Sequence, residues 1–218
     1  DWDIQINYGI KTGFNDAFII TTEKRDEILA NCQTEEERIR TDELIRPILR
    51  GRDIKRYGYD WADLWIINTH NGIKGKLPRV DVNEYPAIKA HLDQYWDKIS
   101  TRADKGDTPY NLRNCAYMED FYKPKIVWGN LNLTASYAMI QDNSFINAPS
   151  PMIVPASKFL LAVLNSKLAD YYIRHLGVTR NGGYFEYKPM FVEKLPVPQS
   201  VDAKVVTDIE SYVDSKNA

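Results

Sequence analysis

Cysteine and histidine are scarce in this chain. The 218 residues include two cysteines, Cys32 and Cys115, which are far apart and form no Cys-x-x-Cys pair. The three histidines, His70, His91 and His175, lack the spacing typical of metal ligands. A disulfide framework and a structural zinc site are therefore not expected, and the cysteine usage favours a reducing, cytoplasmic location.

Long apolar runs are also missing. No stretch approaches the roughly 18 apolar residues that would indicate a transmembrane helix. The first residues, DWDIQINYGIK, show no basic region followed by an apolar core, so no signal peptide is expected. They lack an initiator methionine and alternate like a strand at once, which suggests a piece excised from a longer chain.

Signatures of common enzymes are absent. There is no Asn/Asp-Pro-Pro-aromatic motif, no G-x-G-x-x-G or P-loop, and no G-x-S-x-G elbow. Asp170 with Glu186 and Lys188 does offer the residue types of a metal-dependent nuclease, in which carboxylates hold an ion near a lysine. Acid-x-Lys triplets are common by chance, as a second one at residues 53–55 shows. We therefore predict that the 186–188 triplet is incidental and keep nuclease chemistry as an alternative.

The charge is unevenly distributed. The net charge of −2 alone gives no sign of a polyanionic partner. Residues 23–43 carry eight acids against four bases, and residues 201–218 carry four against two, so the remainder has a net charge of +4. Because a nucleic-acid-binding protein needs a basic face rather than a basic whole, DNA binding stays open.

The sequence predicts an α+β fold. Length and composition fit one large domain or two small ones, with 44% hydrophobic and 27% charged residues. Strands and helices interleave without a regular βαβ repeat. Two short strands are expected around a glycine turn within residues 3–20, and others within 64–67, 123–130, 135–142 and 150–155.

Amphipathic periodicity predicts helices over residues 21–33, 34–49, 82–100, 157–177 and 201–213. Thr34 and Glu37 have the spacing of a capping box at the start of the second. The clearest helix, 157–177, is expected to end at Gly177 and to bury one apolar stripe. That stripe consists of Leu160, Leu161, Leu164, Leu168, Tyr171 and Tyr172.

Basic residues favour a nucleic-acid contact. Residues 46–56 hold five bases and a single acid, Asp53. Arginine suits bidentate contacts to phosphates or guanine edges. Further bases stand beside aromatic residues or glycines, namely Lys11, Arg113, Lys125 and Arg180.

Five segments occur in a familiar order: GIKTGFNDAFII, LIRPILRGRDIKRYGYDWADLWII, YNLRNCAYMEDFYKPKIVW, FLLAVLNSKLADYYI and GGYFEYKPMFVEKLPVP. In this order they resemble the TaqI-like C-terminal specificity domain. That domain is the DNA target-recognition module of type IIG and related restriction–modification methyltransferases, and is akin to the type I specificity subunit. The resemblance covers nearly the whole chain.

The resemblance implies a mixed sheet with flanking helices in a DNA target-recognition domain over residues 1–198, followed by the start of a spacer helix over 199–218. Such a module would bind double-stranded DNA in the major groove and position a separate DNA-adenine methyltransferase (EC 2.1.1.72), with or without type II endonuclease activity. S-adenosylmethionine and Mg²⁺ would belong to that other part. The fragment itself is then expected to catalyse nothing and to hold no cofactor or metal.

Loops are the expected contact sites, because binding residues lie disproportionately on loops. Phosphate contacts would position such a module, and only a few side chains would specify the sequence. Gly182 and Gly183 would let their loop approach the DNA closely. The predicted DNA-binding residues are Lys11, Thr12, Asn15, Arg50, Arg52, Lys55, Arg56, Arg102, Lys105, Arg113, Asn114, Arg180, Asn181 and Tyr184. Besides the nuclease, the remaining alternative is a protein-interaction subunit that pairs through its C-terminal helix.

Overall fold

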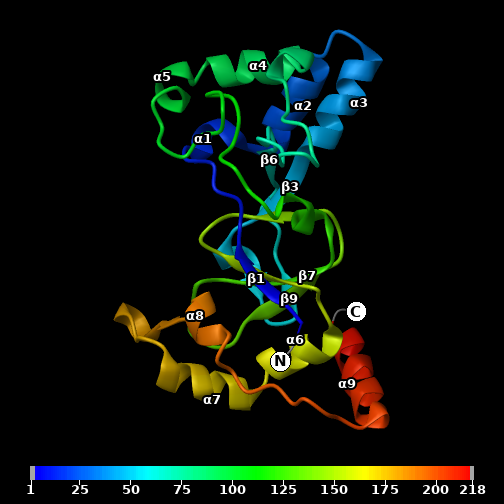
Figure 1. Ribbon diagram of the computed structural model, residues 1–218, viewed down its shortest axis with the longest axis vertical. Coiled ribbons are helices and arrows are strands. Elements are labelled where there is room, and N and C mark those ends of the chain that lie inside the picture. The colour runs from blue at the N-terminus through cyan, green and yellow to red at the C-terminus, as the bar shows by residue number, and fades with distance from the viewer. Residues whose placement is uncertain (1–2, 217–218) are drawn as a thin grey trace. The chain divides into compact units, whose positions relative to one another are not determined.

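The computed structural model describes residues 3–216, which form two compact units whose elements are drawn in Figure 1. Unit 1 comprises the described residues of the stretches 3–9, 49–61 and 120–216, and unit 2 comprises residues 10–48 and 62–119. The outer ends of the predicted ranges 1–198 and 199–218 lie outside the described residues. Strands and helices are mixed in the way an α+β fold requires, which confirms the predicted fold class.

Unit 1 is built on a four-stranded antiparallel sheet in the order β1-β11-β7-β9. Ile153 of β11 pairs with Ile6 on one side and with Ile126 on the other. Every residue of β7 and β11 is buried, as expected for apolar runs covered on both faces. The strands are β1 (Gln5–Tyr8), β7 (Lys125–Trp128), β9 (Tyr137–Ile140) and β11 (Pro151–Val154), so the three predicted over 123–155 are confirmed.

Short strands complete unit 1. β4 (Ile54–Lys55) pairs with β5 (Gly58–Tyr59), and β8 (Leu131–Asn132) pairs with β12 (Phe185–Glu186). β10 (Phe145–Ile146) is buried, and the Phe145 ring stacks on Phe121 with centroids 4.6 Å apart. These short strands position the loops that carry the basic residues.

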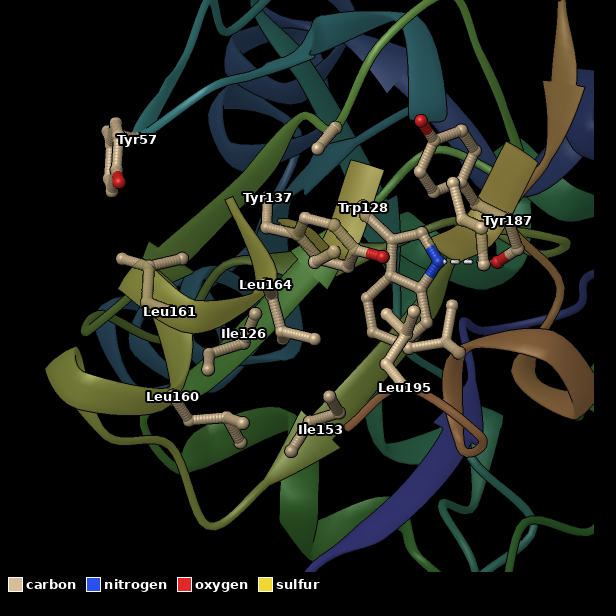
Figure 2. Close-up of a cluster of buried hydrophobic side chains, with 14 of the residues drawn as sticks. Tyr57, Ile126, Trp128, Tyr137, Ile153, Leu160, Leu161, Leu164, Tyr187 and Leu195 are labelled. Atoms are coloured by element: carbon tan, nitrogen blue, oxygen red, sulfur yellow. Dashed lines mark hydrogen bonds between the residues drawn. The ribbon is translucent and has the colours of Figure 1, made fainter. Parts of the chain in front are cut away.

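The core of unit 1 is an aromatic and aliphatic cluster between the sheet and its helices (Figure 2). Trp128, Tyr137 and Leu164 lie at its centre, and the Trp128 indole Nε1 donates a hydrogen bond to the Tyr187 backbone oxygen at 2.7 Å. A buried indole N–H needs such a partner, so this bond fixes the segment after β12 against β7.

The predicted helix over 157–177 is wrong as one helix. α6 (Lys158–Leu164) and α7 (Lys167–Leu176) are separate, with Ser157 and Ser166 as their N-caps. Between them, the Asn165 amide accepts a hydrogen bond from the Tyr137 N–H at 3.0 Å and donates one to its C=O at 2.9 Å. This pairing with β9 competes with helix continuation, and Ser166 then caps a new start.

The predicted apolar stripe is also only half right. Leu160, Leu161 and Leu164 are buried, whereas Leu168, Tyr171 and Tyr172 of α7 are exposed. The break at residues 165–166 disrupts the single periodicity from which the stripe was inferred. In α7, Ala169 and Ile173 face the core instead.

The C-terminal helices belong to unit 1. α8 (Pro189–Val192) follows β12, and α9 (Ala203–Lys216) packs against α6, beside which it lies in Figure 1. Val213 is fully buried, and Lys158 Nζ lies 2.7 Å from an Asp214 carboxylate oxygen. The described part of the predicted spacer helix therefore shares the core of unit 1.

Unit 2 combines a small antiparallel sheet with a helical layer. Its strands β2 (Ile19–Thr21) and β3 (Ile45–Leu49, whose last residue falls in unit 1) pair on either side of β6 (Leu64–Ile67). α2 packs against α3 and α4. The helices are α1 (Asn15–Phe18), α2 (Thr22–Ala30), α3 (Glu35–Leu44), α4 (Pro86–Asp93) and α5 (Trp96–Ile99).

Helix starts in unit 2 follow the sequence. Thr21 caps α2, and the Thr34 hydroxyl accepts from the Glu37 N–H at 3.1 Å at the start of α3. The Glu37 carboxylate accepts from the Gln33 N–H at 2.8 Å, one residue earlier than a standard capping box. The predicted starts over 21–33 and 34–49 are confirmed.

Helix ends in unit 2 were harder to predict. The helix expected over 34–49 ends at Leu44 and becomes β3, in which Pro47 pairs with Trp65, since a proline cannot continue a helix. The helix over 82–100 is split into α4 and α5 at Tyr95, whose ring packs near His91. The second strand expected within residues 3–20 begins only at Ile19, because α1 precedes it. None of the described helices has the length and apolarity needed to cross a membrane.

Candidate nucleic-acid interface

The predicted basic run begins with a tight turn in unit 1. After β3, the 3-10 turn Gly51–Asp53 is closed by Arg50, whose Nε and Nη2 lie 2.9 and 2.7 Å from the two Asp53 carboxylate oxygens. Burial would raise the pKa of Asp53, but the hydrogen bonds from Arg50 outweigh it and hold that pKa below its ordinary value. Asp53 is thus a fixed anion that shapes the turn and orients Arg50.

Close packing favours glycine at position 51 of this turn. A Cβ there would lie 2.9 Å from the Ser150 hydroxyl oxygen and 3.2 Å from the Gly129 Cα. The close approach brings the 50–55 segment against the β7–β8 turn and the loop before β11. Three segments remote in sequence thereby border one hollow.

That hollow is an open groove of about 790 Å³ within unit 1, called here the unit 1 groove. Arg50, Arg52 and Lys55 line it, and none of its lining residues, all in the described part of the chain, is acidic. Tyr184 lies on its rim, half exposed. Polar side chains supply the rest of its hydrogen-bonding capacity, chiefly Asn130, Asn132, Asn147, Ser136 and Ser150.

Some groups in the groove have unused hydrogen-bonding capacity. Within residues 3–216, no hydrogen bond or ion pair engages the Arg52 guanidinium, which is exposed. The Asn130 Oδ1 is buried and has no hydrogen-bond partner in the same residues. By contrast, Lys55 Nζ donates to the Arg52 backbone oxygen at 2.8 Å, and Asn132 Nδ2 to the Gly129 oxygen at 2.6 Å. Arg52 is therefore the cation of the groove most available to a ligand, whereas the Asn130 Oδ1 is shielded from solvent.

The glycine loop beside the groove is held at its base. β12 pairs with β8, and the Arg180 N–H donates to the Tyr184 oxygen at 2.6 Å. Gly182 and Gly183 have φ of +78° and +79°, which residues with a side chain rarely adopt. Asn181, at the tip of the loop, is exposed, and Tyr184 is one of the residues that line the unit 1 groove.

The carboxylates of the proposed nuclease site are used as structural acceptors. Glu186 is buried and forms ion pairs with Lys188, at 2.9 Å, and with Arg180. The hydrogen bonds from Lys188 and from Arg180 lower the pKa of Glu186. Asp170 accepts from the Ala135 N–H and from the Tyr187 hydroxyl. Across residues 3–216 no group of three or more His, Cys, Asp or Glu side chains could hold a metal ion.

Most of the other predicted residues lie in unit 2, around Asp104. Lys11 Nζ lies 2.7 Å and Arg113 Nη1 3.2 Å from the Asp104 carboxylate, and the hydrogen bond from Lys11 is the main cause of its lowered pKa. Lys105 donates to the Ser100 oxygen at 3.0 Å. Asn114 lines a separate hollow of unit 2, and its Oδ1 accepts from Asn71 at 2.5 Å.

Three of the side chains that the sequence offered as possible DNA contacts are buried. Thr12 is buried and its hydroxyl donates to the Asn15 Oδ1 at 2.6 Å, next to α1. Arg102 donates four hydrogen bonds to backbone oxygens, and burial lowers its pKa to about 10. Lys125 is fully buried, bonds the Phe121 oxygen at 2.7 Å, and has a pKa lowered by burial to about 8. Lys125, which the sequence offered as a further candidate base, and the predicted contacts Thr12 and Arg102 are buried and are left out of the interface proposed below.

Arg56 lies on the β4–β5 turn, where its Nη2 donates to the Asn165 backbone oxygen at 2.9 Å.

Sequence reasoning missed the asparagines of the groove, Asn130, Asn132 and Asn147. In the segments GNLNL and INAPS they indicated only turns, and the sequence contains no signal that brings these turns to the basic run.

Comparison with known proteins decides the family. The sequence model of the TaqI-like C-terminal specificity domain matches residues 46–197. This chain belongs to that family. The predicted resemblance is confirmed, and the predicted role as a DNA target-recognition module is the one that this family match supports.

Solved structures show the same fold for this specificity domain. The type IIL restriction–modification enzyme MmeI, in complex with DNA, aligns over 98% of the domain at a TM-score of 0.71 and 14% identity. The type IIG restriction endonuclease BpuSI aligns over 98% at a TM-score of 0.57 and 15% identity. The chain spans 27% and 25% of these two proteins, respectively.

Proposed function

We propose that this specificity domain recognises a short sequence in double-stranded DNA through the unit 1 groove. The observation that carries the proposal is the groove lining, which combines three cations with several side-chain amides and includes no acid among the described residues. Cations attract the phosphate backbone, whereas amides and arginine forks distinguish base edges. The family match and the fold shared with two restriction enzymes support the same role.

Within this proposal, Arg52 makes a sequence-specific contact, and the side-chain amides of the groove are the further candidates. Arg52 presents an unengaged planar fork that suits the O6 and N7 atoms of guanine, and an asparagine amide suits the N6 and N7 atoms of adenine. Arg50 and Lys55 are already oriented by Asp53 and by the Arg52 backbone oxygen, so they suit phosphates. Tyr184 lines the groove, and the glycine loop that carries Asn181 precedes it and adds contacts.

We further propose that the domain works as part of a longer protein with a DNA-adenine methyltransferase (EC 2.1.1.72), with or without an endonuclease. Support comes from the chain's share of about a quarter of the two restriction enzymes. The residues of this chain fit neither S-adenosylmethionine nor Mg²⁺, because they offer no glycine-rich cofactor loop and, in the described part, no carboxylate cluster. Both groups and the chemistry belong, in this proposal, to the other part, in the cytoplasm.

A fluorescence anisotropy titration tests the groove. The 218-residue chain is titrated with a labelled pool of random duplexes at salt concentrations between about 50 and 200 mM. Arg52→Ala should weaken binding, while Arg38→Ala, which removes an exposed arginine of α3 and the same charge, should not. Equal affinities for the wild type and Arg52→Ala at every salt concentration would contradict the proposal.

A further inference from the structure

Unit 2 carries a second basic surface, and Asn114 is the one predicted DNA-binding residue among its described lining residues. It is a hollow of about 680 Å³ formed by the segment 71–79 and by Asp107 and Asn114, which lie in the segment after α5. Lys74, Lys76 and Arg79 are its cations, and Asp107 is its single acid among the described lining residues. We call the segment 71–79 the lysine hairpin.

The backbone of the lysine hairpin is tightly specified. Ile73 and Leu77 exchange hydrogen bonds of 2.8 and 2.9 Å, which closes the turn Lys74-Gly75-Lys76. Gly72 and Gly75 have φ of +72° and +75°. A Cβ on Gly72 would lie 2.4 Å from the Leu77 oxygen, so only glycine fits there, whereas at Gly75 the surrounding space is open.

The base of the hairpin is anchored in the interior of unit 2. The Val80 N–H donates to the His70 oxygen at 3.1 Å, and the buried Asn111 amide donates to the Val80 oxygen at 2.9 Å. Asn71 donates to Asp107 at 3.1 Å and to Asn114 at 2.5 Å. The two lysines are thus presented on a rigid support, which limits the conformational entropy lost on binding.

The charges on the hairpin are only partly neutralised. Lys76 pairs with Glu119, and Arg79 lies 3.4 Å from Asp107, but 62% of the Lys76 side chain and 41% of the Arg79 side chain remain exposed. Lys74 is exposed, and within residues 3–216 it makes no hydrogen bond or ion pair. A solvent-exposed pair contributes little to folding, so the three cations are not explained by stability.

We infer that the lysine hairpin is a phosphate-binding surface for the DNA backbone, formed by Lys74, Lys76 and Arg79 and independent of the unit 1 groove. The inference rests on the proposed function and extends it from base recognition to backbone binding. Flexible lysines act on phosphates as point charges and carry little sequence information. The hairpin therefore adds affinity that depends on salt and is the same for every sequence.

The test compares two charge-matched variants of the 218-residue chain. Lys74→Ala/Lys76→Ala removes the two lysine charges of the hairpin, and Lys24→Ala/Lys89→Ala removes two lysines of α2 and α4 that form local ion pairs. Each is titrated with a random duplex pool across salt, and each is used to select duplexes from a random library. Lys74→Gln is a third variant, which disturbs no described contact.

Log affinity falls with log salt, and the hairpin variant should make this negative slope shallower by about two. Lys74→Gln should make it shallower by about one, and the enriched sequence should stay unchanged in both. The control pair should keep the wild-type slope. A hairpin variant that behaves like the control, or one that changes the enriched sequence, overturns the inference. If Arg52→Ala still weakens binding in that case, the proposed function stands. A wild-type chain that binds no duplex overturns both.

Discussion

The Tyr187 hydroxyl donates a hydrogen bond to Asp170 Oδ1 at 2.8 Å, which joins the segment after β12 to the first turn of α7. The same carboxylate accepts from the Ala135 N–H at 2.9 Å and from Arg174 Nε at 3.0 Å. Tyr187 also accepts the Trp128 indole N–H through its backbone oxygen. Tyr187 therefore holds in place the segment around β12, which carries Tyr184 to the lining of the unit 1 groove.

Loss of the Tyr187 hydroxyl should destabilise the chain. Hydrogen bonds to charged groups contribute about 1.5–3 kcal/mol, and Tyr187→Phe removes one without changing the ring packing. Urea unfolding should show a loss in that range. Tyr171→Phe, at an exposed position of α7, should change the free energy of unfolding by no more than about 0.5 kcal/mol. Equal losses for the two variants would show that the Asp170 contact contributes nothing.

The break between α6 and α7 depends on Asn165. Asn165→Ala leaves the buried Tyr137 N–H without its partner, which costs about 1–3 kcal/mol. It also removes one of two donors to the Tyr137 C=O, which keeps the hydrogen bond from the Tyr57 N–H at 2.8 Å. Urea unfolding should therefore report a destabilisation of several times that of Asn143→Ala, an exposed position in the β9–β10 turn. A variant as stable as the wild type would indicate that the helices can join instead.

The buried Lys125 should give unfolding a characteristic pH dependence. Burial lowers its pKa to about 8, whereas a lysine in the unfolded chain keeps its ordinary pKa of about 10.4. Between these values the unfolded chain binds the proton that the folded chain has released, so the free energy of unfolding rises with pH. Burial raises the pKa of Tyr137, which acts in the opposite direction above about pH 10.

The difference between wild type and Lys125→Met isolates the lysine. Relative to the variant, the wild type should gain stability from about pH 8 to 10, measured by urea unfolding at several pH values. Parallel pH profiles for the two proteins would show that Lys125 does not change its protonation state in that window.

Arg52 should determine sequence preference through its fork. Arg52→Lys keeps the charge but removes the bidentate geometry, so it should lose about 1–3 kcal/mol of discrimination at one base pair while keeping the salt dependence. Competition between duplexes that differ at single positions measures this loss. An unchanged preference in Arg52→Lys would reassign Arg52 to a phosphate.

Local signals predicted a large part of the fold. Thr21 and Thr34 mark helix starts because capping is a short-range contact, and the strands over 123–155 follow from apolar runs between turns. The end of α3 was missed even though Pro47 stands in the sequence, because the apolar periodicity runs on past it. The Asn165 break depends on a partner 28 residues away, which no local pattern reveals.

The candidate site was predictable only in outline. The density of bases over residues 46–56 pointed to Arg50, Arg52 and Lys55, and the structure brings these three together at one groove; their contact with DNA stays a prediction. Burial was invisible: Lys125 and Arg102 look like surface bases in the sequence but donate to interior backbone oxygens. The groove amides were missed for the same reason, since an asparagine in a turn indicates local geometry and not the distant segment that it faces.

The most direct test of the central claim is selection of bound duplexes from a random DNA library with the 218-residue chain, followed by sequencing. The account predicts enrichment of one short sequence, which Arg52→Ala weakens or changes and Arg38→Ala leaves intact. Recovery of duplexes without any enriched sequence, or an identical enriched sequence with Arg52→Ala, would contradict it.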